Sequence, residues 1–178
     1  GGRRWNTSCG PGHSELASTE GNGAKTQTGS QLVRNGSSDH QGCCKAVIGL
    51  DTNVLVRFVV QDDPEQAEAA GRLIENRCTR DSPGLVSGLV LAELVWVLRG
   101  AYHFEKPVVV SVLRQILQTA ELTVDNPALI WAALSDFENG SADFADCLIG
   151  HGNHAGGCAA TFTFDRKAAQ SRYFELVS

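Results

Sequence analysis

The pattern of apolar and polar positions divides the chain into two unlike parts. Up to residue 44, Gly, Ser, Thr, Asn and Gln dominate, and apolar residues stand singly without the period of a helix or a strand. Such a segment buries too little surface to offset the entropy lost on ordering. We therefore predict a disordered leader over residues 1–44. Because the sequence contains no Met, we expect this leader to be non-native or non-functional, with the natural start near Lys45.

From Lys45 onward, short apolar runs alternate with amphipathic stretches. Strands are expected at 46–50, near 85–86, at 159–162 and at 174–177. Helices are expected where Asp, Ser, Asn or Pro precedes an amphipathic run. Their expected ranges are 64–76, 87–98, a stretch from 107, a stretch from 127, 142–154 and 166–172. This alternation predicts an α/β domain over residues 45–178 around a central, mainly parallel sheet.

Acidic residues punctuate these elements. Two follow predicted strands, one lies on the helix after the second strand, and two lie on one face of the helix at 142–154. The carboxyl ends of parallel strands share one sheet edge, so we expect the acids to converge there. Clustered carboxylates repel each other and lose hydration, and a hard divalent ion compensates both effects. The candidate ligands for Mg²⁺ or Mn²⁺ are Asp51, Glu93, Asp143, Asp146 and Asp165.

Most of these acids also have a purely structural explanation. Asp51 can end its strand in a turn stabilised by its own side chain. Asp143 and Asp165 are natural N-caps for the helices that follow them. Asp146 lies further into its helix, so we rank it above Asp143 as a metal ligand.

A purely structural explanation fits Glu93 less well. A Glu on a helix normally faces solvent. On a helical period, however, Glu93 shares its face with the apolar Leu89, Trp96 and Val97. Structural and functional roles are therefore evenly balanced for this residue.

The charge of the chain weakens the case for a nucleic-acid partner. The net charge is −5 and the pI about 5.5, whereas phosphate binding normally leaves a basic surface. Much of the negative charge lies in the acidic cluster, where bound cations would reverse its sign. Four basic residues near the acidic motifs can hold phosphates: Arg57, Arg99, Arg166 and Lys167.

Other chemistries find little support. The six Cys include no C-x-x-C pair, so we expect reduced thiols, with Cys147 and Cys158 as small core residues. His103, His151 and His154 have no metal-binding spacing and are expected at the surface or in loops. Glycine-rich phosphate loops are missing, which disfavours ATPase and dinucleotide roles. No secretory signal or membrane span is evident, so we expect a soluble cytoplasmic protein.

Five motifs, in order, resemble those of PIN-domain ribonucleases, and most closely the VapC-type toxins of type II toxin–antitoxin pairs. The resemblance covers about residues 46–177. The motifs are Gly49-Leu50-Asp51-Thr52-Asn53-Val54-Leu55-Val56-Arg57, Asp62-Asp63-Pro64, Val90-Leu91-Ala92-Glu93-Leu94-Val95-Trp96-Val97-Leu98, Asp143-Phe144-Ala145-Asp146 and Thr163-Phe164-Asp165-Arg166-Lys167.

The resemblance implies a three-layer α/β/α fold and Mg²⁺- or Mn²⁺-dependent cleavage of RNA. It also implies a homodimer and a cognate antitoxin that inserts into the active-site groove. By position, Asp51, Glu93 and Asp146 match the core acids of the family. Asp165 matches a fourth, more variable acid, and Asp143 an additional acid of this branch.

The expected mechanism is hydrolysis of a phosphodiester by a water that the ion activates. Asn53 and Thr163 would orient the metal-ligating carboxylates without contacting the ion themselves. One alternative is a haloacid-dehalogenase-like phosphatase, which would need a second Asp where the chain has Asn53. The other is a non-catalytic RNA- or protein-binding module whose acids are only caps and turns.

Overall fold

The computed structural model describes residues 47–178, so the predicted leader over residues 1–44 lies outside the described residues. Strands and helices alternate along the described part of the chain. The helices are α1 (Thr52–Val60), α2 (Pro64–Arg77), α3 (Gly88–Gly100), α4 (Lys106–Gln118), α5 (Pro127–Asn139) and α6 (Phe144–Ala155). The strands are β1 (Gly84–Val86), β2 (Leu122–Val124), β3 (Thr161–Thr163) and β4 (Phe174–Leu176). None of the helices in residues 47–178 has the length and apolar character to cross a bilayer.

The strands pair in parallel, as the sequence predicts. β1 pairs with β2, with Gly84 opposite Leu122. The chain just before Asp51 joins the other side of β1, where Leu50 N–H donates to the Leu85 carbonyl at 2.8 Å. β3 and β4 form a second parallel pair. The α/β class is therefore confirmed, and the named strands form two separate parallel pairs.

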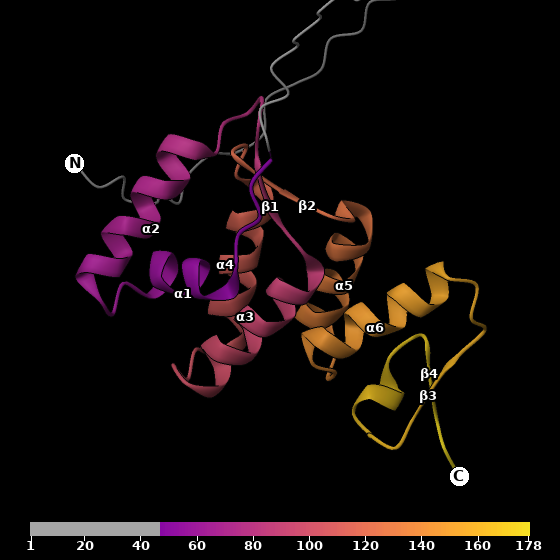
Figure 1. Ribbon diagram of the computed structural model, residues 1–178. Coiled ribbons are helices and arrows are strands. Elements are labelled where there is room, and N and C mark those ends of the chain that lie inside the picture. The colour runs from indigo at the N-terminus through magenta and orange to yellow at the C-terminus, as the bar shows by residue number, and fades with distance from the viewer. Residues whose placement is uncertain (1–46) are drawn as a thin grey trace, which may run out of the picture. The chain divides into compact units, whose positions relative to one another are not determined.

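Helices cover the β1–β2 pair from both sides. Figure 1 shows α1 and α2 on one side of this pair and α5 on the other, with α6 leading away to β3 and β4. The core between these layers holds the largest fully buried rings, Phe137 of α5 and Phe144 of α6, which meet edge to face at 5.8 Å. This contact fixes the N-terminus of α6, where two of the candidate acids lie.

Side-chain caps explain why three of the helix starts were predictable. Asp63 Oδ1 accepts from Gln66 N–H at 3.1 Å, and Ser87 Oγ accepts from Val90 N–H at 3.3 Å. Asn126 Oδ1 accepts from Leu129 N–H at 3.2 Å. Each bond satisfies a backbone donor that the first turn of a helix leaves unpaired.

Three elements differ from the prediction. The strand β2 was not among the expected strands. The apolar run after Asp51 forms α1, a helix that the sequence pattern did not reveal because its β-branched residues favour strands in isolation. The helix expected at 166–172 is wrong: only a single 3₁₀ turn forms, at Ala168–Gln170. Asp165 Oδ1 accepts from Lys167 N–H at 2.7 Å and so makes a tight turn, which leads the chain into β4.

The β3–β4 pair packs on α6 through a glycine. A Cβ at Gly150 would lie only 2.8 Å from Phe174 Cε2, so no larger residue fits there without displacing the ring. This close approach holds the C-terminal segment, including the Asp165 turn, against α6.

Candidate active site

Asp51 lies where the sequence places it, directly after the extended segment that pairs with β1. It is the N-cap residue of α1 and its side chain is exposed. Asn53 Nδ2 donates to Asp51 Oδ2 at 3.3 Å. The bond holds the carboxylate at the helix N-terminus, where the macrodipole favours a negative charge.

Glu93 lies on α3 and is tied to the Asp51 region by a short hydrogen bond. Thr52 Oγ1 donates to Glu93 Oε2 at 2.5 Å, and Thr52 is only 3% exposed. A buried donor fixes one carboxylate oxygen and leaves the other available. The sequence did not reveal this link, because the two residues are 41 positions apart.

The face of α3 that carries Glu93 is turned toward solvent. Leu89 is 79% and Trp96 75% exposed, while Leu91 and Leu94 fill the core. The expectation that apolar neighbours make a solvated Glu93 uncomfortable is therefore wrong. These neighbours are themselves at the surface.

Asp143 and Asp146 form a reciprocal cap at the start of α6. Asp146 Oδ2 accepts from Asp143 N–H at 3.3 Å, so capping involves both residues and not Asp143 alone. Asp143 Oδ1 also accepts from Arg99 Nη1 at 2.9 Å. This ion pair connects α6 to α3.

The charge of Asp146 is compensated only in part, by the hydrogen bond from the Asp143 N–H. Burial raises the pKa of its carboxyl group, and the negative charges of Asp143 and Asp165 raise it further. Asp165 follows β3, and its own N–H donates to Thr163 Oγ1 at 3.0 Å. Asp146 is therefore close enough to Asp143 and to Asp165 for their charges to oppose its own.

The five candidate acids thus form two sets. Asp51 and Glu93 are joined through Thr52, and the other set is Asp143, Asp146 and Asp165. Over residues 47–178, no three His, Cys, Asp or Glu side chains surround one point closely enough to hold a metal ion. Convergence of both sets on a single ion stays a prediction.

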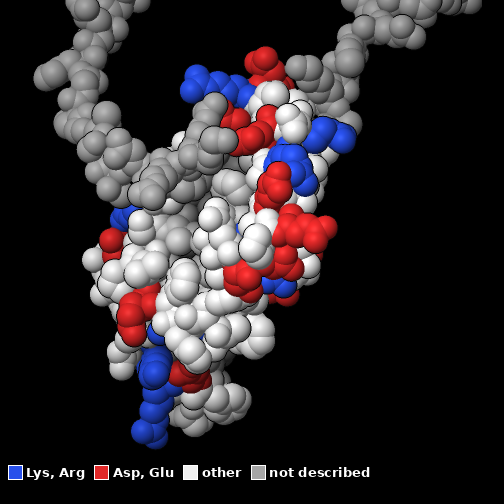
Figure 2. Space-filling model, turned by 90° about the vertical axis from the view of Figure 1, so that its left-hand side faces the viewer, with Lys and Arg blue, Asp and Glu red and all other residues white. Residues whose placement is uncertain are grey.

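The donor chemistry nevertheless fits a hard divalent cation. All the donors are carboxylate oxygens, which Mg²⁺ and Mn²⁺ prefer. Arg99 pairs with Asp143, while burial first and the charges of Asp143 and Asp165 second raise the pKa of Asp146, and a bound cation would offset both effects. Figure 2 shows the side of the molecule that lies to the left in Figure 1, where acidic and basic side chains of the described residues are interspersed.

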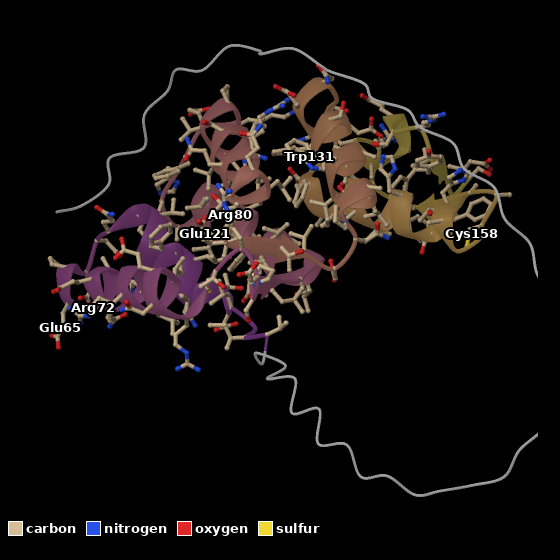
Figure 3. All side chains as sticks on the ribbon, turned by 90° about the horizontal axis from the view of Figure 1, so that it is seen from above. Glu65, Arg72, Arg80, Glu121, Trp131 and Cys158 are labelled. Atoms are coloured by element: carbon tan, nitrogen blue, oxygen red, sulfur yellow. The ribbon has the colours of Figure 1, made fainter. Side chains whose placement is uncertain are left out.

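Several expectations about other reactive side chains can be settled. Cys147 is buried, and burial raises the pKa of its thiol to about 11, which confirms a core residue rather than a nucleophile. The prediction that Cys158 is a core residue is wrong, because Cys158 is exposed between α6 and β3 (Figure 3). His103 and His154 are exposed as expected. His151 is not, since only 13% of its side chain is exposed and Nε2 lies 2.8 Å from Asp136 Oδ2.

We expect Asp146→Asn to raise the stability of the protein at pH 7 when divalent ions are absent. Because the folded pKa is raised above the ordinary value of 3.8, the folded state holds this proton more tightly than the unfolded chain. Stability therefore falls as pH rises from that value through the raised pKa. Asn keeps an acceptor for Asp143 N–H but carries no charge. Thermal unfolding in EDTA should show a higher Tm for the variant at pH 7.

The comparison has a matched control. Asp143→Asn removes the ion pair with Arg99 and should give no such gain. At about pH 3 Asp146 is protonated in both states, so the advantage of Asp146→Asn should vanish. An advantage of equal size at both pH values would contradict the repulsion inferred at this site.

Comparison with known proteins gives one match. The family model described as "PIN domain" matches residues 48–173. Neither the curated proteins nor the solved structures gave a match. PIN domains are typically metal-dependent nucleases, which supports nuclease activity, and hence hydrolase chemistry, for this chain. With parallel strands, acids at a strand end and a helix N-terminus, and a match over most of its length, the chain belongs to the PIN domain family.

Proposed function

We propose that the protein is an Mg²⁺- or Mn²⁺-dependent endoribonuclease that acts as the toxin of a toxin–antitoxin pair. The observation that carries the proposal is the acidic set around Asp146, whose charges repel one another in a chain of the PIN family. A protein without a cation at this place would gain stability by losing the charge of Asp146. Retaining this charge is reasonable if a cation binds there during function.

In this proposal, Asp51, Glu93 and Asp146 hold the ion, and Asp143 and Asp165 stand beside them. The ion, when bound, supplies an activated water and neutralises the charge that develops on the phosphodiester.

The chain's own residues orient these acids. Thr52 fixes one oxygen of Glu93, and Asn53 holds one oxygen of Asp51. Thr163 accepts the N–H of Asp165 and so sets the turn that presents this side chain. Such supporting bonds keep ligands in one geometry and raise the affinity of a site for its metal.

Protein partners are part of the proposal. Phe162 of β3 is 68% exposed, and Phe164, which follows β3 directly before Asp165, is 83% exposed. Exposed aromatic rings next to an acidic site suit a protein that covers the site. We propose a cognate antitoxin there, a homodimer in solution, and action in the cytoplasm, where the RNA is.

Incubation of the purified protein with total RNA and Mg²⁺, followed by mapping of new RNA ends, tests the proposal. We expect discrete new ends that EDTA prevents and Mn²⁺ restores. Overexpression should arrest growth, and co-expression of the neighbouring small gene should relieve the arrest. Hydrolysis of small phosphate monoesters with RNA left intact would favour the phosphatase alternative. RNA binding that ignores EDTA, without cleavage, would favour the binding module.

A further inference from the structure

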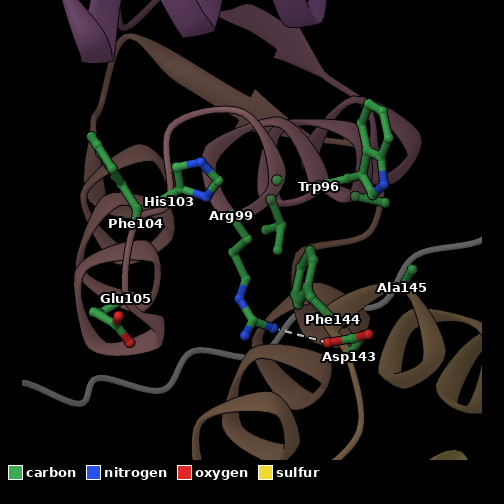
Figure 4. Close-up of a pocket in the computed structure, with 11 residues that line it drawn as sticks. Trp96, Arg99, His103, Phe104, Glu105, Asp143, Phe144 and Ala145 are labelled. Atoms are coloured by element: carbon green, nitrogen blue, oxygen red, sulfur yellow. Dashed lines mark hydrogen bonds and ion pairs between the residues drawn. The ribbon is translucent and has the colours of Figure 1, made fainter.

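A cavity lies beside the candidate acids, between α3 and the N-terminus of α6. Its volume is about 470 Å³, and α3 contributes Trp96 and Arg99 to its lining. The chain after α3 contributes His103 and Phe104, and α6 contributes Asp143. Figure 4 shows Arg99 reaching across to Asp143, with Trp96 and His103 on different sides of that ion pair. Cavities of this size accommodate small organic groups.

Trp96 contributes little to the protein core. It is 75% exposed, whereas Leu94, Val95 and Leu98 provide the buried side of the same helix. An indole ring is a large apolar surface to leave in water, and exposed aromatic rings often mark binding sites. With three-quarters of its surface exposed, the indole offers area on which a flat partner can stack.

Arg99 provides a positive charge at the centre of the cavity lining. Its Nη1 donates to Asp143 Oδ1 at 2.9 Å, and 43% of its side chain remains exposed. A guanidinium group has five N–H donors, so one bond to a carboxylate leaves donors for a second anion. Arginine is well suited to phosphate oxygens, which it contacts with two parallel hydrogen bonds.

The position of the cavity relates it to the proposed chemistry. Glu93 precedes Trp96 by three residues on α3, so the two side chains are neighbours on one helix face. Asp143, at the other border, lies in the same acidic set as Asp146. A group bound in the cavity would therefore be next to the candidate acids.

We propose that this cavity binds one unpaired nucleotide of a single-stranded RNA, with its base stacked on Trp96 and a phosphate held by Arg99. The inference rests on the proposed ribonuclease function, whose substrate class it narrows. The carboxylates of Glu105 and Asp143 also line the cavity and repel an anion there, so the neutral base fills it and the phosphate binds at Arg99. In a duplex, neighbouring base pairs cover the base faces, which excludes stacking on a side chain.

The test is the affinity of the full chain for a fluorescein-labelled single-stranded oligoribonucleotide of mixed sequence, measured by anisotropy. Ca²⁺ replaces Mg²⁺ to slow cleavage. We expect Trp96→Ala to raise the Kd about tenfold, as for other stacking platforms. Trp96→Phe, which keeps a ring, should lose much less. Leu89→Ala is the matched control, because Leu89 is equally exposed on the same helix but does not line the cavity.

A second oligonucleotide isolates the stacked base. With abasic sites throughout, it keeps the phosphates, so Trp96→Ala should no longer matter while Arg99→Ala should still weaken binding. Equal Kd values for wild type and Trp96→Ala on the normal oligonucleotide would overturn the proposal. So would a change of oligomeric state in sedimentation velocity without a change in RNA affinity, since Trp96 would then cover a second copy of the chain.

The two proposals fail in different ways. If the wild type cleaves RNA and Trp96→Ala has the same Kd and KM as the wild type, the ribonuclease function stands and the nucleotide site is contradicted. If Trp96→Ala weakens oligonucleotide binding but the wild type does not cleave RNA, the nucleotide site stands and the ribonuclease function is contradicted. A wild type that does not bind the oligonucleotide at all overturns the site.

Discussion

Replacing Asp51 by Asn should reduce metal-dependent RNA cleavage by at least about a hundredfold while leaving the fold intact. Removing a group that stabilises charge at a reacting centre typically costs a hundred- to a thousandfold in rate. Asp51 is exposed at the N-cap of α1, so the core does not depend on its charge. The Asp51 side chain makes no capping bond to the backbone of α1, so an Asn there removes none. The rate of cleavage of a labelled RNA in Mg²⁺ and the Tm provide the two readouts.

Asp81→Asn is the control for this substitution. Asp81 is exposed in the turn between Thr79 and Ser82 and is not among the candidate acids. The Asp81→Asn variant should cleave RNA at the wild-type rate. That result would show that losing one surface carboxylate does not by itself lower activity. Wild-type cleavage by Asp51→Asn with an unchanged Tm would remove Asp51 from the site.

Thr52→Val should reduce cleavage about ten- to a hundredfold, the usual effect of removing a group that orients a metal ligand. Valine has the shape of threonine but lacks the hydroxyl group that donates to Glu93 Oε2. Because Thr52 is buried and Glu93 is exposed, the substitution frees the carboxylate without leaving a buried acceptor unpaired. The reduction should appear together with a higher Mg²⁺ concentration for half-maximal activity.

Thr52→Ser keeps the donor and loses only a methyl group. We expect it to retain most of the activity and the wild-type Mg²⁺ requirement. If Val and Ser lower activity equally, packing at Thr52 matters and the hydrogen bond to Glu93 does not. Loss of activity at all Mg²⁺ concentrations with an unaltered half-maximal value would also contradict a role in holding the ion.

Local sequence signals predicted those elements whose starts are determined locally. Asp63, Ser87 and Asn126 each bond to a backbone N–H three residues later, which is why their helices could be predicted from short motifs. Asp51 was placed correctly because it directly follows an apolar run that pairs with β1. The positions of the other candidate acids along the helices and strands could be predicted from the same kind of local signal.

Contacts between segments far apart in the sequence could not be predicted from the sequence alone. Thr52 to Glu93 and Arg99 to Asp143 join residues 41 and 44 positions apart, and both depend on how α3 packs against α1 and α6. The helix α1 is an example of the same limit, since burial of Leu55 outweighs the strand preference of its neighbours.

The account depends on both acidic sets binding one ion, and Mn²⁺ binding tests this most directly. Electron paramagnetic resonance counts free Mn²⁺ during titration and needs no RNA cleavage. Asp51→Asn and Asp146→Asn each remove one carboxylate, the first from one set and the second from the other. We predict that both substitutions weaken the same Mn²⁺ site, whereas Asp81→Asn leaves it unchanged. Tight Mn²⁺ binding that neither substitution weakens, or no Mn²⁺ binding by the wild type, would contradict the account.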